Sequence, residues 1–237
     1  MSFNLQSTDP SNMHTRYYLR IAAAYVRGKL REQYKQDFRF QRPLADMTEQ
    51  EWEELFVLGK QAELKLHRFK RNMELARVQK VLGLLRGLHP KDLLDIGTGR
   101  GVFLWPLLDE VPGLKLSCLD ILPFRVDDLK AIQSGGYPNL HAHLLDITSS
   151  GLPENYADGI TFLETLEHIP SPQLAVEEAC RLARRFVIVS VPSKADDNPE
   201  HIHLFTPPRL EELFRTAGAK SVKFSSVHNH LIMLAML

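Results

Sequence analysis

Cysteine is nearly absent from this sequence, which has only Cys118 and Cys180 among its 237 residues. Two cysteines are too few for a disulfide framework, and they do not form a C-x-x-C metal motif. The N-terminal residues are polar and lack the apolar core of a secretion signal. The longest apolar runs fall far short of the roughly 20 residues that span a bilayer. These absences predict a cytoplasmic protein with free thiols and no membrane span.

Net charge is also absent, because 29 Lys and Arg residues balance 29 Asp and Glu residues. Dedicated nucleic-acid binders usually carry a basic excess, since phosphate contacts dominate their affinity. The overall balance therefore argues against such a role, although it does not exclude a local basic patch. The hydrophobic share of 44% and the charged share of 24% are those of an ordinary globular protein of one or two domains.

Charge is segregated along the first third of the chain. Residues 16–42 hold eight Lys and Arg against two acids, residues 46–63 hold six acids against one Lys, and residues 65–80 hold six Lys and Arg against one Glu. These faces could neutralise one another in a small helical cap. Alternatively, they could leave a basic surface that guides an anionic substrate or RNA.

Hydrophobic periodicity divides the chain into a helical part and an alternating part. Apolar residues recur at helical spacing through residues 13–87, including a helix that starts with a Thr48–Glu51 capping box and another over residues 68–88. From residue 91 onward, helices over 102–109, 124–134, 171–183 and 206–218 separate strands over 92–96, 115–121, 141–145, 159–163, 186–191, 221–227 and 230–236. This order predicts an α/β fold with a doubly wound, mostly parallel sheet and a C-terminal antiparallel hairpin. We assign residues 1–88 to a helical N-terminal cap or lid and residues 89–237 to the sheet domain.

The glycine-rich segment at residues 95–101, Asp-Ile-Gly-Thr-Gly-Arg-Gly, ends the first predicted strand and leads into a helix. Doubly wound sheets bind their ligands at this position. Glycines allow sharp turns and let a ligand approach the main chain. The nicotinamide pattern G-x-G-x-x-G does not fit, because it would need a glycine at Val102. No Gly-Lys-Ser/Thr follows, so a phosphate-binding P-loop is also excluded.

Acidic residues end the next two predicted strands, at Asp120 and at Asp146. An acid nineteen residues beyond the glycine loop is well placed to accept ribose hydroxyls. Together with Asp95 they form a series of three carboxylates at successive strand ends, which turn propensity alone explains poorly.

This pattern resembles the first signature of class I S-adenosylmethionine-dependent methyltransferases over roughly residues 90–237, and it implies their Rossmann-like fold. The cofactor carries a cationic amino group, a carboxylate and a sulfonium, but no phosphate. By resemblance, Asp95 complements the amino group, Asp120 holds the ribose and Asp146 faces the adenine. The predicted cofactor-binding residues are Asp95, Gly97, Thr98, Gly99, Gly101, Asp120, Ile121, Asp146, Ile147 and Glu164.

The Glu-x-x-Glu-His segment at residues 164–168 follows the fourth predicted strand. It resembles a segment that two branches of the family use for a divalent metal, namely ubiquinone-pathway O-methyltransferases and small-RNA 3′-terminal 2′-O-methyltransferases. In the RNA branch a later histidine completes the site, and this chain offers His201 or His203. The predicted metal ligands are Glu164, Glu167, His168 and His203. In the alternative without a metal, Glu164 shapes the cofactor pocket and His168 caps a helix or acts as a base.

The resemblance implies methyl transfer to a small-molecule acceptor, with oxygen as the expected target. A hydroxyl acceptor needs a base that titrates near neutral pH, and His168 is the first candidate, followed by His203 and His201. The predicted catalytic residues are therefore His168, His203 and Glu164, whereas His228 and His230 are assigned to the hairpin turn. Two alternatives stay open: metal-assisted methylation of an RNA end, and a cofactor-binding partner protein without catalysis. No feature of the sequence predicts an oligomeric state.

Overall fold

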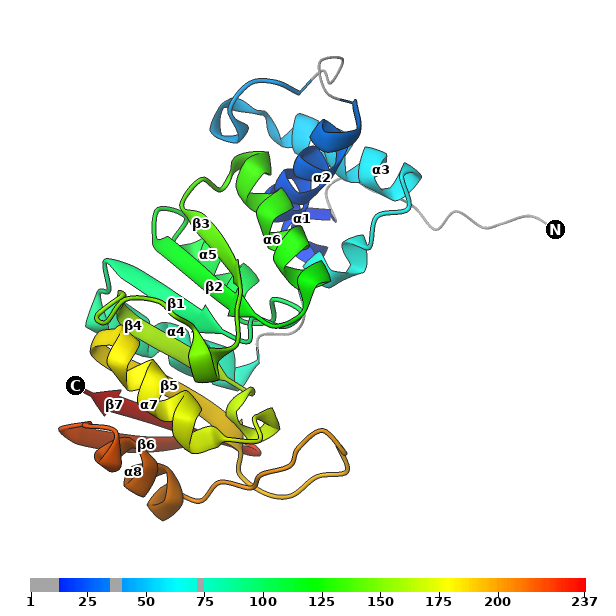
Figure 1. Ribbon diagram of the computed structural model, residues 1–237. Helices are drawn as coiled ribbons and strands as arrows, with labels where there is room; N and C mark the ends of the chain where they lie inside the picture. The colour runs from blue at the N-terminus through cyan, green and yellow to red at the C-terminus, as the bar shows by residue number, and fades with distance from the viewer. Residues whose placement is uncertain (1–12, 35–39, 72–74) are drawn as a thin grey trace.

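The computed structural model describes residues 13–34, 40–71 and 75–237 of the chain. In these residues a seven-stranded sheet has the order β3-β2-β1-β4-β5-β7-β6 (Figure 1). Strands β1 to β5 are parallel, and β7 runs antiparallel between β5 and β6. The strands are β1 (Asp92–Ile96), β2 (Lys115–Asp120), β3 (Leu140–Leu144), β4 (Ala157–Leu163), β5 (Ala183–Pro192), β6 (Ser221–Val227) and β7 (His230–Met236). The Rossmann-like fold and its antiparallel C-terminal hairpin are confirmed.

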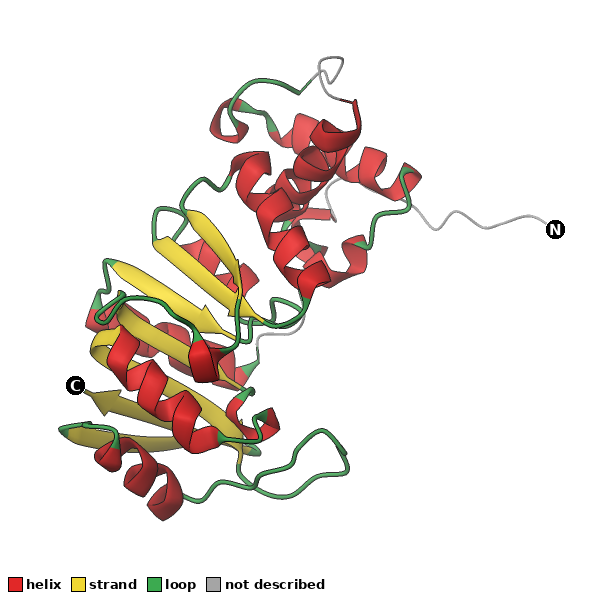
Figure 2. Ribbon diagram, viewed as in Figure 1, coloured by secondary structure: helices red, strands yellow, loops and turns green. Residues whose placement is uncertain are grey.

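Alternation along the buried strands sends successive side chains to two separate hydrophobic clusters. Leu93, Phe186 and Ile188 join the cluster that contains helices α4, α5 and α6, whereas their neighbours Leu94 and Val187 join the cluster of α7 and α8. Figure 2 shows these helices against the sheet. The helices are α1 (Met13–Arg16), α2 (Leu19–Tyr34), α3 (Glu49–Gln61), α4 (Ala76–Leu88), α5 (Leu104–Glu110), α6 (Pro123–Gly136), α7 (Pro172–Leu182) and α8 (Pro207–Thr216).

The N-terminal helices join the sheet through a close contact between α2 and α6. Small residues make it possible: a Cβ on Gly28 would lie 1.9 Å from the carbonyl oxygen of Ala131, and one on Gly135 would lie 1.7 Å from that of Ala24. The buried Arg27 reinforces the contact by donating from Nε to the Gly135 carbonyl at 2.6 Å. The boundary after residue 88 stays a prediction, because the cap and the sheet share one of the two hydrophobic clusters.

The capping box predicted for α3 is confirmed. The Glu51 amide donates to the Thr48 hydroxyl, and the Thr48 amide donates to the Glu51 carboxylate at 2.7 Å. No helix in the described ranges is both long enough and apolar enough to cross a membrane.

The helix predicted over residues 68–88 is wrong in its first part. The short 3-10 helix η4 (Leu66–Phe69) takes its place, and α4 begins only at Ala76. Backbone hydrogen bonds explain the difference, because the Tyr18 amide donates to the Phe69 carbonyl and the Arg71 amide to the Arg16 carbonyl. These bonds hold the chain after η4 beside residues 16–18, so it cannot continue as a helix.

Candidate functional site

The glycine loop connects β1 to α5 with three residues in the left-handed region, where φ is 69° at Gly97, 60° at Gly99 and 80° at Gly101. Glycine adopts this region without the steric cost that a Cβ imposes. Space is also limiting, since a Cβ on Gly97 would lie 2.3 Å from the Thr165 side chain and one on Gly101 would lie 1.9 Å from the Trp105 ring. The loop can therefore fold in this way only with glycine at these positions.

Asp95 lies near the end of β1 and is only 3% exposed. Its Oδ1 accepts a hydrogen bond from the Thr161 hydroxyl of β4 at 2.7 Å. Burial raises the pKa of Asp95 to about 7, and the nearby Asp120 carboxylate adds to the rise, while the Thr161 hydrogen bond opposes it. Within the described residues, no cation pairs with this carboxylate. Such a group suits a ligand that brings its own positive charge.

Asp120 ends β2 and ties the glycine loop to the neighbouring strand. Its carboxylate accepts hydrogen bonds from the Leu122 amide at 2.9 Å and from the Gly99 amide at 3.3 Å, and Arg125 lies 3.7 Å away. Because β1 and β2 are parallel neighbours, Asp95 and Asp120 share the carboxyl edge of the sheet.

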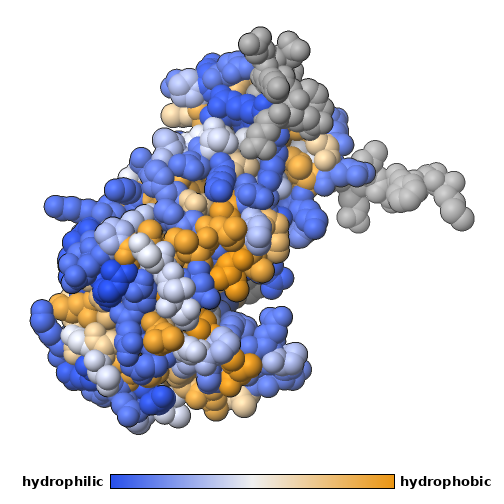
Figure 3. Space-filling view, viewed as in Figure 1, coloured by the Kyte–Doolittle hydropathy of each residue, from blue (hydrophilic) through white to orange (hydrophobic). Residues whose placement is uncertain are grey.

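The predicted site residues that follow β2 and β3 differ in how far they are exposed to solvent. Asp146 is exposed, and its Oδ1 accepts from the amide and hydroxyl of Thr148, both at 2.8 Å. Ile147 is only 3% exposed and packs in the core, whereas Ile121 after β2 is 64% exposed. In Figure 3, an apolar area lies in the middle of the face in view. Ile121 directly follows Asp120, so its exposed side chain offers an apolar surface beside that carboxylate.

A cavity of about 140 Å³ opens between β1, the glycine loop, α4 and the end of β4. Among its lining residues are Asp95, Gly97, Thr98, Gly99 and Glu164, all predicted from the sequence. Small-molecule sites usually enclose about 300–1,000 Å³, so this cavity fits one end of a ligand of that size. The remainder of such a ligand would extend along the open carboxyl edge.

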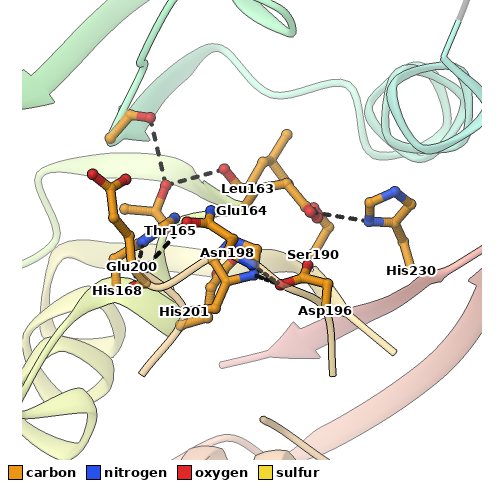
Figure 4. A network of polar contacts seen from close by, with 12 residues as sticks. Leu163, Glu164, Thr165, His168, Ser190, Asp196, Asn198, Glu200, His201 and His230 are labelled. Carbon is orange, nitrogen blue, oxygen red and sulfur yellow. Dashed lines mark hydrogen bonds and ion pairs between the residues drawn. The ribbon is translucent and has the colours of Figure 1, made fainter. Parts of the chain in front are cut away.

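Glu164 lines this cavity and has a positive φ of 51°, which is rare for a residue other than glycine. Ser190 donates to its Oε1 at 2.6 Å, and His230 Nδ1 lies 3.0 Å from its Oε2 (Figure 4). Burial acts to raise the pKa of Glu164, but His230, Ser190 and the nearby Arg77 outweigh it and hold that pKa below its ordinary value. Glu164 is therefore an anchored anion facing the cavity.

Glu167, His168 and His201 form a separate cluster whose ligand atoms all lie within 4.8 Å of one another. Glu167 is fully buried, and neither of its carboxylate oxygens has a hydrogen-bond partner in the described structure. Burial raises the pKa of Glu167 to about 8, and the carboxylates of Glu164 and Asp196 add to the rise. A buried polar group without a hydrogen-bond partner is costly, and a ligand bound by its oxygens would remove that cost.

Both histidines of the cluster are held through Nδ1. His168 Nδ1 lies 2.8 Å from the Glu200 carbonyl, and His201 Nδ1 lies 2.9 Å from the Asp196 carboxylate (Figure 4). Both partners accept, so Nδ1 donates to them, and Nε2 of the neutral ring offers a lone pair. His201 Nε2 is 4.0 Å from Glu167 Oε1. This is the arrangement by which proteins orient histidines as metal ligands or as bases.

The structure selects His201 rather than His203 for this cluster. His203 Nε2 lies 3.0 Å from the Ile169 carbonyl, and its ring lies against Phe205. Glu164 also lies outside the cluster, because its Oε1 accepts from Ser190 and its Oε2 contacts His230. Of the four metal ligands predicted from the sequence, the structure brings together Glu167 and His168.

Sequence reasoning missed several residues of the site, among them Arg77, Ser190 and His230. Ser190 could have been found, because it pairs with Leu163 at the carboxyl end of neighbouring strands. His230 was assigned to a turn, yet it starts β7 opposite Pro192 and so reaches the same edge. Arg77 carries no such signal, since its helix is placed by long-range packing.

Comparison with known proteins agrees with this geometry. A family model described as a methyltransferase domain matches residues 66–223, about two-thirds of the chain. A ubiquinone biosynthesis O-methyltransferase of Sodalis glossinidius is 32% identical over 110 residues. That match covers 46% of this chain and 43% of the relative, so the chain is aligned with less than half of that relative's length.

Solved structures share the fold at low sequence identity. An O-methyltransferase structure from Nostoc punctiforme, described as putative in function, superposes with a TM-score of 0.57 at 15% identity, covering 92% of this chain and 69% of its own. Magnesium protoporphyrin IX methyltransferase from Synechocystis, solved with S-adenosylhomocysteine bound, has a TM-score of 0.52 at 16% identity, covering 68% of this chain and 81% of its own. The family match, the sheet order and the glycine loop lead to one conclusion: the chain belongs to the methyltransferase-domain family.

Proposed function

We propose that this enzyme methylates a hydroxyl oxygen of a small molecule beside Glu164 and the Glu167–His168–His201 cluster. The observation that carries the proposal is that Glu164 lines the same cavity as Asp95 and the glycine loop, and that Glu167 and His168 of the cluster follow it within four residues. The match to ubiquinone biosynthesis O-methyltransferases supports an oxygen acceptor. The cytoplasmic location expected from the sequence stays a prediction.

The residues present fit S-adenosylmethionine, because the buried Asp95 carboxylate lacks a cation within the described chain and the glycine loop leaves the backbone accessible. In this proposal Asp95 takes the amino group, Asp120 the ribose and Asp146 the adenine, with Ile121 against the ring. The cofactor supplies a methyl group activated by a positively charged sulfur. The protein then acts mainly by aligning the acceptor with it.

His168 is the proposed base. With Nδ1 held on the Glu200 carbonyl, its Nε2 lone pair can accept the proton that the acceptor hydroxyl loses as its oxygen forms the new bond to carbon. Glu164, fixed by Ser190 and His230, orients the acceptor beside the cavity. Its anchoring keeps the side chain from turning toward the neighbouring Glu167.

The buried Glu167 carboxyl group, which has no hydrogen-bond partner in the described structure, and the Nε2 atoms of His168 and His201 also fit a divalent metal. One carboxylate and two imidazoles are a donor set that such ions accept. Glu167, His168 and His201 would hold it, and a bound cation would lower the pKa of an acceptor hydroxyl. If the metal occupies His168 Nε2, the base role passes to another group.

A methyl-transfer assay with labelled S-adenosylmethionine tests this proposal. Small phenols and alcohols serve as acceptors and a short RNA oligonucleotide as comparison, each with and without EDTA. We expect transfer to a hydroxyl compound, lost in His168→Ala and retained in His203→Ala. Transfer to the RNA 3′ end alone would favour the RNA acceptor, and equal activity of the two variants would contradict the role of His168.

A further inference from the structure

A second and larger cavity, of about 650 Å³, lies between η4, α4 and α5. It shares Val78, Arg100 and Val102 with the cavity of the cofactor site, so these residues form a common wall. Its volume lies in the usual range for small-molecule sites. Neither the cofactor site nor the Glu–His cluster uses this space.

The lining of this cavity is strongly basic. Lys70 and Arg71 follow η4, Arg68 belongs to it, and Arg100 comes from the glycine loop. These cations come largely from the basic stretch at residues 65–80 that the sequence singled out. The structure thus gathers them around one hollow instead of spreading them over a solvated helix face.

The acids of the lining do not neutralise it. Asp109 pairs with Arg71 at 2.8 Å, and Glu110 pairs with Arg86, which lies outside the lining, at 2.7 Å. Lys70 and Arg100 make no ion pair with any described residue. The cavity therefore keeps an excess of positive charge that favours an anion.

The walls also hold the cations in place. The Arg71 guanidinium lies 4.3 Å from the Tyr18 ring centroid, and the Arg68 guanidinium pairs with Asp128. Trp105 donates from Nε1 to the Arg68 carbonyl at 3.1 Å, which fixes the backbone beside η4. Arginines held in this way lose little freedom when they bind an oxyanion bidentately.

We infer that this cavity binds an oxyanion group, phosphate or carboxylate, of the methyl acceptor and so makes the enzyme selective for anionic small molecules. The shared wall lets the charged end of the acceptor sit against Lys70, Arg71 and Arg100 while its hydroxyl reaches past Val102 toward the cofactor. This inference rests on the proposed function, since it names the substrate class of the same site.

Calorimetric titration at constant ionic strength tests the inference, with inorganic pyrophosphate as the phosphate probe and malonate as the carboxylate probe. We expect one of them to bind at one site per chain, and the tighter probe identifies the source of the oxyanion. Lys70→Gln and Arg100→Gln should each weaken that binding about tenfold, which is the effect of losing one charge-assisted contact. Lys80 is an exposed lysine of α4 outside the cavity. Lys80→Gln removes the same charge and should leave the binding of the anion unchanged.

Three results would overturn the inference: binding of neither anion, equal weakening in Lys80→Gln and Lys70→Gln, or displacement of S-adenosylhomocysteine by the anion. Binding of single-stranded RNA without either small anion would overturn it as well. S-adenosylhomocysteine is titrated in parallel. If it binds and the anions do not, this inference fails while the proposed function stands, and if it does not bind, the proposed function fails by itself.

Discussion

Replacing Asp95 by Asn should stabilise the cofactor-free enzyme at alkaline pH while weakening its cofactor binding. Burial raises the pKa of Asp95 from the ordinary 3.8 to about 7. The groups that face it are the Asp120 carboxylate and the Cys118 thiol of β2, the Thr161 hydroxyl of β4 and the Thr98 hydroxyl of the glycine loop, and none of them is a cation. The folded protein must therefore keep an unfavourable negative charge whenever Asp95 is ionised.

The sign and size of the effect follow from proton linkage. Because the folded pKa is raised, the stability tied to Asp95 is fully present below pH 3.8 and is lost as the pH rises through about 7. Each pH unit in that interval costs about 1.4 kcal/mol, which amounts to about 4 kcal/mol in total. The neutral amide introduced by Asp95→Asn carries no such charge, so the advantage of this variant should grow from pH 5 to about pH 7 and level off above it.

Urea unfolding of both proteins at several pH values measures this difference. Subtracting the two free energies of unfolding cancels the other titrating groups. The matched control is Asp127→Asn, which removes an exposed carboxylate of α6. Its free energy of unfolding should differ from that of the wild type by the same amount at every pH. A flat difference for Asp95→Asn would refute the reasoning. In the wild type, affinity for S-adenosylhomocysteine should rise with pH up to about 7, because its amino group favours the ionised carboxylate.

Three further variants test other parts of the structure. Gly135→Ala should lower the free energy of unfolding by about 1–3 kcal/mol, because a Cβ would meet the α2 backbone. The control Gly113→Ala has open space around it and should leave the free energy of unfolding unchanged. Equal free energies of unfolding for the two variants would show that the α2–α6 contact is looser. Asp120→Asn should weaken S-adenosylhomocysteine binding about 10–100-fold in calorimetry, the cost of one or two charge-assisted hydrogen bonds, and unchanged affinity would remove Asp120 from the ribose site. Manganese should raise the melting temperature of the wild type and of His203→Ala, but not that of His201→Ala. A rise in all three proteins would place the metal elsewhere. No rise in any of them would rule out the proposed metal site.

Local sequence signals predicted the sheet well. The hairpin strands have the bounds expected, Ser221–Val227 and His230–Met236, because alternating side chains and a short turn specify them locally. The glycine loop was also predictable, since its backbone admits hardly any other residue. Asp95 and Glu164 line one cavity because strand ends meet at one edge of a parallel sheet.

Long-range contacts decided what the sequence left open. His201 and His203 are two residues apart on one loop, and the loop's path determines which of them faces Glu167. That path is fixed when the amides of Ile202 and His203 both donate to the Glu167 carbonyl, a contact across more than thirty residues. The extended chain after η4 likewise depends on residues 16–18, and no local periodicity reports such pairing.

A crystal structure with S-adenosylhomocysteine bound tests the central claim most directly. The account predicts that the amino group of the ligand contacts Asp95, that its ribose hydroxyls contact Asp120 and that its sulfur points toward Glu164. A ligand whose ribose turns away from Asp120, or whose amino group contacts another acid, would contradict it.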